Sequence, residues 1–121
     1  MKYTLPQPVG IYRIYNTITG KSYIGQSSNV YNRVRRHFRN LKQQNISENK
    51  QMRRDYRLYS NGFKAEILEL CPMVGMTNYE VYKWLKDNEQ YYIGKYDTEN
   101  TGYNGKYAPP KWCEWKHRKI V

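Results

Sequence analysis

Two tyrosines near the start of the chain are spaced so that their hydroxyl groups can share one face of a small sheet. Tyr12 lies in an extended stretch at 9–15 and Tyr23 in another at 21–25, with turn-forming residues at 16–20 between them. β-Branched and aromatic residues around such a turn predict a β-hairpin, and side chains alternate along its strands. Both phenols then lie on one face of the sheet, although two tyrosines that only pack a core would have the same spacing.

Arg33 and His37 lie four residues apart, so they are neighbours on one face if the segment is helical. Residues 29–43 have the helical spacing of apolar side chains, with caps available at Ser27, Ser28 or Asn29. An arginine beside an imidazole can bind a phosphate and carry a proton. The alternative is a solvated arginine next to a histidine at the edge of the core.

Glu89 falls in the apolar row of a further predicted helix, four residues after Leu85 and four before Ile93. A carboxylate that is ionised and unpaired in such a row costs several kcal/mol. It therefore needs either a structural arginine or a divalent metal, whose protein ligands are mainly carboxylate oxygens. We interpret Glu89 as a metal ligand, with the ion pair as the alternative.

The segment between these residues predicts a second helix that is short and basic. Ser47 has the side chain expected of its N-cap, and Asn61 with Gly62 predicts its end, where a residue with left-handed backbone is needed. Residues 63–70 then alternate as a third strand.

The third helix has the clearest start signal in the chain. Thr77 and Glu80 match a capping box, and the helical pattern continues to Gly94, while residues 95–121 look irregular. The element order β-β-α-α-β-α predicts an α+β domain, in which a small three-stranded antiparallel sheet is flanked by three helices.

The positive charge of the chain is concentrated in two segments. The 121 residues suit one domain and carry a net charge of +11, and Lys and Arg exceed Asp and Glu by nine to two in 29–57 and by five to one in 106–121. This concentration favours a nucleic-acid partner over a generally basic surface. The predicted contacts with the phosphate backbone are Arg35, Arg36, Arg39, Lys42, Lys50, Arg53, Arg54 and Arg57.

The sequence shows no sign of a membrane span or of secretion. No apolar run approaches the roughly 18 residues that a membrane span needs, and the N-terminus lacks the apolar stretch of a secretion signal, so we expect a cytoplasmic protein. In that compartment Cys71 and Cys113 are expected to be two reduced thiols.

The spacing of these motifs resembles the GIY-YIG nuclease family. The tripeptide Gly-Ile-Tyr at 10–12 is followed ten residues later by Tyr-Ile-Gly at 23–25, and then by Arg33 and His37. Downstream, the stretch from Glu89 to Ile93 is similar to the family's metal-binding helix. Gly-Tyr-Asn at 102–104 is similar to its late asparagine motif.

The resemblance implies a metal-dependent endonuclease domain at 1–105, followed by a basic, aromatic tail at 106–121. It also implies that the tyrosines lie beside the attacking water, one of them as general base, that the arginine stabilises phosphate charge and that the histidine moves protons. The glutamate would hold one Mg²⁺ or Mn²⁺ ion, and the asparagine would support the site. These roles fall on Tyr12, Tyr23, Arg33, His37, Glu89 and Asn104.

One departure from the family concerns the loop after the first helix, where some homing members carry a second histidine. No histidine lies between His37 and His117 here, and Ser47 and Asn49 are the polar candidates in that loop.

The expected substrate is DNA, duplex in preference to single strands, cut by a free-standing nuclease or catalytic domain of phage or mobile-element type. The alternatives are a restriction-type or single-strand nuclease on the same scaffold, and a nucleic-acid-binding module without catalysis.

Overall fold

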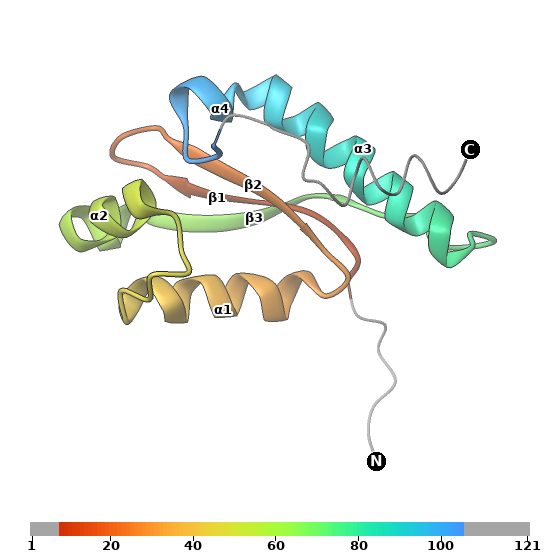
Figure 1. Cartoon of the computed structure of the whole chain (residues 1–121), viewed down its shortest axis with the longest axis horizontal. Helices are drawn as coiled ribbons and strands as arrows, with labels where there is room; N and C mark the ends of the chain where they lie inside the picture. Colours follow the sequence, from red (N-terminus) through yellow and green to blue (C-terminus); the bar gives the residue numbers. More distant parts are fainter. Residues whose placement is uncertain (1–7, 106–121) are drawn as a thin grey trace, which may run out of the picture.

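A computed structural model describes residues 8–105, and they form a three-layered α+β domain (Figure 1). The antiparallel sheet has the strand order β2-β1-β3, with β1 at Gly10–Asn16, β2 at Ser22–Ser27 and β3 at Phe63–Leu70. On one side lie α1 (Val30–Lys42) and α2 (Lys50–Tyr59), and on the other lie α3 (Asn78–Tyr96) and the short α4 (Thr98–Thr101). The predicted fold class and element order are confirmed.

Alternation along the central strand divides the core into two clusters. The first packs α1 and α2 against the sheet through Tyr12, Ile14, Val30, Leu41, Met52, Phe63 and Tyr103. The second packs α3 against the opposite face through Val9, Ile11, Ile24, Cys71, Leu85 and Ile93. Because β1 contributes to both clusters, its side chains are fixed from both sides, and Tyr12 is held on the face covered by α1.

The hairpin has the register that the tyrosine prediction required. Tyr12 pairs with Gly25 and Ile14 pairs with Tyr23 across β1 and β2. Residues two apart on a strand share a face, so Tyr12 and Tyr23 emerge on the same side of the sheet. The shared face predicted for the two phenols is therefore confirmed.

Two helix starts agree with the sequence and a third does not. Asn29 caps α1, and Thr77 with Glu80 forms both hydrogen bonds of the capping box on α3. At α2 the prediction of Ser47 as cap was wrong, because Asn49 accepts the Met52 N–H at 2.9 Å.

Two predicted helix ends were also wrong. Gly62 does not have left-handed backbone; it ends a 3-10 turn at Ser60–Gly62, and a Cβ there would lie 2.9 Å from the Asn16 side chain. The irregular region begins later than expected, because α3 continues to Tyr96 and Asp97 takes the left-handed position that separates it from α4.

The predicted tail and Cys113 lie outside the described residues, whereas Cys71 is a buried free thiol. None of the helices within 8–105 is both long and apolar enough to cross a membrane.

Candidate active site

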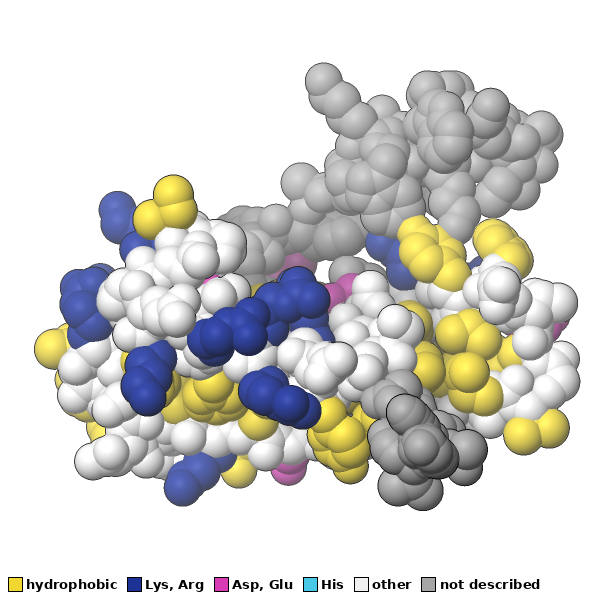
Figure 2. All heavy atoms as spheres, turned by 90° about the horizontal axis from the view of Figure 1, so that it is seen from below, with side chains coloured by type: hydrophobic (Ala, Val, Ile, Leu, Met, Phe, Trp, Pro, Cys, Tyr) yellow, Lys and Arg dark blue, Asp and Glu magenta, His cyan; other side chains and the backbone are white. Residues whose placement is uncertain are grey.

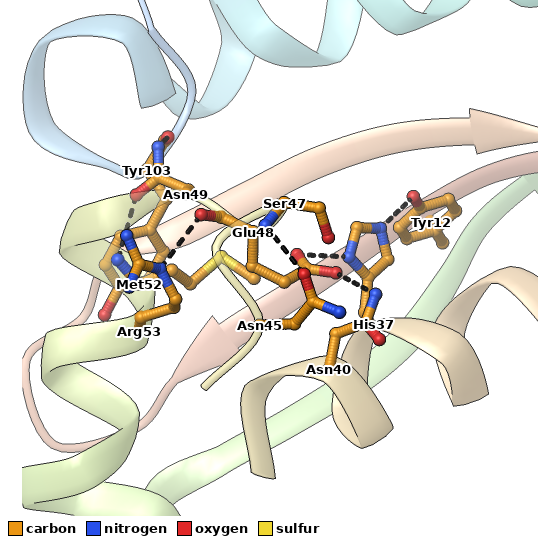
Figure 3. A network of polar contacts seen from close by, with 10 residues as sticks. All are labelled: Tyr12, His37, Asn40, Asn45, Ser47, Glu48, Asn49, Met52, Arg53 and Tyr103. Carbon is orange, nitrogen blue, oxygen red and sulfur yellow. Dashed lines mark hydrogen bonds and ion pairs between the residues drawn. The ribbon is translucent and has the colours of Figure 1, made fainter. Parts of the chain in front are cut away.

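Three aromatic rings from three elements meet under the α1 face of the sheet. The Tyr12 hydroxyl oxygen lies 2.7 Å from His37 Nε2, so β1 is joined to α1 by a buried hydrogen bond (Figure 3). The Tyr23 ring lies 5.3 Å from the His37 ring and 6.4 Å from the Tyr12 ring, measured between centroids. The structure thus brings together the two tyrosines and the histidine that the sequence singled out.

Gly25 makes room for the Tyr12 ring. It pairs with Tyr12 across the hairpin, and a Cβ at this position would lie 2.3 Å from the Tyr12 hydroxyl oxygen. Any side chain at Gly25 would push the phenol away from His37. The last glycine of the Tyr-Ile-Gly motif is therefore needed for close approach.

His37 has a second partner that the sequence did not predict. Its Nδ1 lies 2.8 Å from Glu48 Oε1, and Asn40 Nδ2 donates to Glu48 Oε2 at 3.2 Å. The side chains of His37 and Glu48 are only 5% and 8% exposed. Ser47 and Asn49, the polar candidates of the sequence, flank Glu48. The prediction therefore identified the loop that contacts His37 but not the carboxylate in it.

The phenols are held in their neutral form in the free protein. Burial raises the pKa of Tyr12, and Tyr23 and Glu89 add to the rise, while the Arg33 guanidinium opposes it. Burial and the charge of Glu89 likewise raise the pKa of Tyr23, again against Arg33. A further positive charge near these rings would be needed to favour a phenolate.

Glu89 is half-buried on α3, and its charge acts on both tyrosines. Burial raises the pKa of its carboxyl, and the charge of Lys86 lowers it only in part. Within residues 8–105 no ion pair is formed on this carboxylate, so the alternative of a structural arginine partner is wrong for the described chain.

The Glu89 carboxylate fits a metal that needs few protein ligands. No group of three or more His, Cys, Asp and Glu side chains in the described part of the chain could enclose an ion. Mg²⁺ usually keeps several waters and is held by one or two carboxylates together with substrate phosphates. A single carboxylate without a cationic partner is compatible with this kind of binding.

A polar cavity of about 320 Å³ opens beside the three rings. Its lining comes from β2, α1 and the loop before α2, and comprises Tyr23, Arg33, Arg36, His37, Asn40, Ser47, Glu48 and Asn49. Arg33 is half-buried there, as its position next to the apolar stripe predicted. Tyr12 does not line the cavity and is 1% exposed, so Tyr23 presents its ring to the opening and Tyr12 lies behind it.

Asn104 is joined to the outer edge of β2. Its side chain accepts the Ile24 N–H at 2.8 Å and donates to the Ile24 carbonyl at 3.0 Å. The Tyr103 N–H donates to the Ser22 carbonyl at 2.8 Å, so the two residues on either side of Tyr23 are both tied to the end of the domain. Asn104 therefore fixes the strand that carries Tyr23.

The predicted phosphate contacts lie on the side of the sheet covered by α1 and α2. Figure 2 shows Lys and Arg side chains gathered over this face, with apolar atoms between them. Arg35, Arg36 and Arg39 line one surface hollow with Asn32. A hollow of about 520 Å³ is lined by Asn49, Lys50, Gln51, Arg53, Arg54 and Arg57.

The two acidic residues of the basic segment neutralise little of this surface. Glu48 binds His37, and Asp55 is buried, where it accepts a hydrogen bond from the Tyr103 hydroxyl at 2.8 Å and lies 3.5 Å from Arg54 Nε. The exposed part of the segment is consequently more positive than its composition indicates.

Comparison with known proteins connects this geometry to a family. The model of the GIY-YIG catalytic domain matches residues 8–104. Intron-associated endonuclease 1 of Enterobacteria phage T4 is 32% identical over 95 residues, which cover 78% of this chain and 36% of that protein. The chain thus spans about a third of the length of this curated relative.

Two solved structures have the same fold. The catalytic domain of the homing endonuclease I-TevI superposes with a TM-score of 0.69 at 26% identity, covering 82% of this chain and 99% of that one. A mutant of the catalytic domain of intron endonuclease I-TevI superposes with a TM-score of 0.71 at 27% identity, covering 84% of this chain and 97% of that one. The chain therefore belongs to the GIY-YIG catalytic domain family and is a nuclease related to phage intron endonucleases.

Proposed function

We propose that this domain hydrolyses phosphodiester bonds of DNA with a divalent ion, Mg²⁺ or Mn²⁺, bound by Glu89. The observation that carries the proposal is the Glu89 carboxylate, which forms no ion pair within residues 8–105 and whose charge acts on both hairpin tyrosines. The T4 relative and the I-TevI domain are named as intron or homing endonucleases, which supports a DNA substrate in a phage or mobile-element setting. Duplex DNA as the preferred form is part of the proposal.

The side chains around the cavity can carry out the steps of hydrolysis. Arg33 lines the opening, where its guanidinium can neutralise the charge that builds on the scissile phosphate. The phenols would lie beside the attacking water, one of them as general base, and the bond from Tyr12 to His37 gives the proton a route away. When bound, the metal ion would supply Lewis-acid stabilisation of phosphate oxygens.

The remaining predicted residues would bind and support. Asn104 would keep Tyr23 in place through β2. The lysines and arginines of α1 and α2 would grip the DNA backbone, so this domain alone would read little sequence. The proposal also divides the chain into a nuclease domain at 1–105 and a basic tail at 106–121.

The test is metal-dependent cleavage of duplex, nicked and single-stranded DNA by the full chain and by three variants: Tyr12→Phe, Arg33→Ala and Glu89→Ala. Each variant should lower the cleavage rate roughly 100-fold or more, because each removes a group that acts on the reacting atoms or their charge. Glu89→Ala should still bind DNA. Glu66→Gln is the matched control, since it removes an exposed carboxylate on β3 that pairs with Arg13.

Three results would contradict the proposal. Cleavage by Glu89→Ala at the rate of the unsubstituted chain would remove the metal ligand from the mechanism. DNA binding without cleavage in Mg²⁺ or Mn²⁺ would instead favour a binding module, and a preference for single strands would overturn the duplex substrate.

A further inference from the structure

Among residues 8–105, Glu48 is the buried carboxylate in the cavity lining that the proposed mechanism does not use. It lies in the loop between α1 and α2 and contacts Nδ1 of His37, whereas Tyr12 contacts Nε2 on the other side of the ring (Figure 3). A surface loop has no need to bury an acid, so its contact with a candidate proton carrier calls for a physical explanation.

We propose that Glu48 is a positioning residue, which fixes His37 in the form that accepts a proton from the Tyr12 hydroxyl. The inference rests on the proposed nuclease function and adds a residue to it. It applies to Glu48 as a group that acts through His37, without contact to the substrate.

The direction of the hydrogen bonds follows from the charge of Glu48. Burial raises the pKa of the Glu48 carboxyl, but hydrogen bonds from His37 and Asn40 and nearby positive charge outweigh this, and the pKa is lowered overall. An ionised carboxylate only accepts hydrogen bonds, so His37 Nδ1 must carry a proton. In the neutral ring Nε2 then has a lone pair, and the Tyr12 hydroxyl is the donor in the 2.7 Å bond.

This arrangement allows a balanced proton transfer. The O–H bond of Tyr12 breaks as an N–H bond forms at His37 Nε2, which leaves a phenolate and an imidazolium ion. Glu48 then stabilises the imidazolium through its charge, and Arg33 opposes the rise in the pKa of Tyr12. The phenolate can in turn take a proton from water.

Charged and titratable groups face His37 from every neighbouring element. They are Tyr12 on β1, Tyr23 on β2, Arg33 and Arg36 on α1 and Glu48 in the loop, and Glu89 on α3 acts on the two tyrosines. Of the two carboxylates in this set, only Glu48 is hydrogen-bonded to the imidazole among the described residues. The positioning role therefore falls on Glu48.

The loop holds Glu48 in place before any substrate arrives. Arg53 Nε donates to the Glu48 carbonyl at 3.2 Å, and the side chain of the next residue, Asn49, donates to the Tyr103 carbonyl at 2.7 Å. Asn40 on α1 holds the second carboxylate oxygen. With both its backbone and its side chain fixed, Glu48 can impose one orientation on the His37 ring.

The first test reads the tautomer directly and does not depend on cleavage. The chain has two histidines, so a His117→Gln variant leaves His37 as the single imidazole for long-range ¹H–¹⁵N correlation spectra. We expect a proton on Nδ1 and none on Nε2. Glu48→Ala should give a mixture of tautomers, whereas Glu66→Gln should leave the spectrum unchanged. A proton on Nε2 in the parent, or a spectrum that Glu48→Ala does not alter, would overturn the inference.

The second test uses the pH profile of cleavage. Glu48→Ala should lower kcat roughly 10- to 100-fold with little change in KM. Glu48→Gln keeps the acceptor and the size of the side chain but removes the charge, so it should lose less activity. In both variants the acidic limb of the profile should move to lower pH, because the imidazolium loses its counter-charge.

The outcomes separate this inference from the proposed function. A purely structural Glu48 would lower activity and thermal stability without moving the acidic limb, and that result would overturn the positioning role. If the parent chain cut no DNA, the proposed function would fail, while the tautomer spectra would still decide whether Glu48 positions His37. Glu48→Gln keeps the test valid if Glu48→Ala does not fold.

Discussion

Glu89 weakens the fold in the ionised state that the proposed reaction requires. Its pKa is raised by burial, so the folded chain binds this proton more tightly than the unfolded chain does. The protonated Glu89 carboxyl therefore adds to the free energy of unfolding, and this contribution is complete below the pKa of the unfolded chain, near 4.3. It is lost as pH rises through the higher pKa of the folded chain.

Glu89→Gln should accordingly raise the melting temperature at pH 7.5 while it abolishes cleavage. The gain should shrink at pH 4, where the glutamate of the parent is mostly protonated. Differential scanning calorimetry at the two pH values measures this, with Glu66→Gln as a control that shows no gain. A lower melting temperature for Glu89→Gln at pH 7.5 would mean that a partner already holds the carboxylate.

Gly25→Ala should disrupt the site more than its size indicates. The new methyl group would lie 2.3 Å from the Tyr12 hydroxyl oxygen, so the phenol must shift and its bond to His37 is lost. Cleavage should fall roughly 100-fold. Gly94→Ala is the matched control, because nothing lies within 4 Å of its Cβ, and on a helix it should stabilise α3 by about 0.5–1 kcal/mol. Full activity in Gly25→Ala would show that the Tyr12 position is not required.

At the scale of elements, local signals predicted most of the fold. The hairpin turn, the apolar stripe of α1 and the capping box of α3 each depend on residues close in sequence, and all three are confirmed. The choice between Ser47 and Asn49 as the cap of α2 was different. Both residue types can cap a helix, and Asn49 also binds the Tyr103 carbonyl, a contact 54 residues away that no local pattern contains.

The same limit explains why Glu48 was missed. The sequence shows the type and charge of Glu48. In the charge balance of 29–57, however, Glu48 was set against nine cations as if it were a solvated acid. Its burial depends on the path of the loop, which Arg53 and Asn40 set through tertiary contacts. A useful signal was that only two acids occur in this basic segment, and both are hydrogen-bonded in the interior. Glu89 could be found because its conflict with an apolar helical row is local.

Asn49→Ala should destabilise the domain by about 1–3 kcal/mol, because it removes both the α2 cap and the bond to the Tyr103 carbonyl. Asn45→Ala is the comparison, since its side chain only accepts the exposed Ser47 N–H, and it should cost less than about 0.5 kcal/mol. Urea unfolding of both variants gives the two values. Equal values would show that the link between α2 and the end of the domain contributes nothing.

At the scale of the molecule, positive charge covers the side of the sheet where the cavity opens (Figure 2). Because Glu48 and Asp55 are turned inward, few acidic groups of the described residues lie near the cations of α1 and α2: Asp55 lies 3.5 Å from Arg54, and Glu66 lines a hollow with Arg35. DNA should therefore approach the site from this side, and its affinity should depend strongly on salt.

If about six phosphates are neutralised, the logarithm of the affinity should fall with the logarithm of salt concentration at a slope near −5. Arg36→Ala should reduce the magnitude of this slope by about 1, whereas Lys64→Ala on β3, outside the lining of the basic hollows, should not. Fluorescence anisotropy with a catalytically inactive Glu89→Ala chain measures the slopes. Equal slopes for the two variants would place the DNA elsewhere.

The clamp that Tyr103 and Asn104 place on β2 has a consequence for how the enzyme is made. These residues bind Ser22, Ile24 and Asn49, so the turn at 102–104 adds a direct link between the first hairpin and the loop that carries Glu48. A ribosome must release that turn from its exit tunnel before the pocket can close. We therefore expect nascent or prematurely terminated chains that end before this turn to carry the other proposed catalytic side chains but to lack cleavage activity.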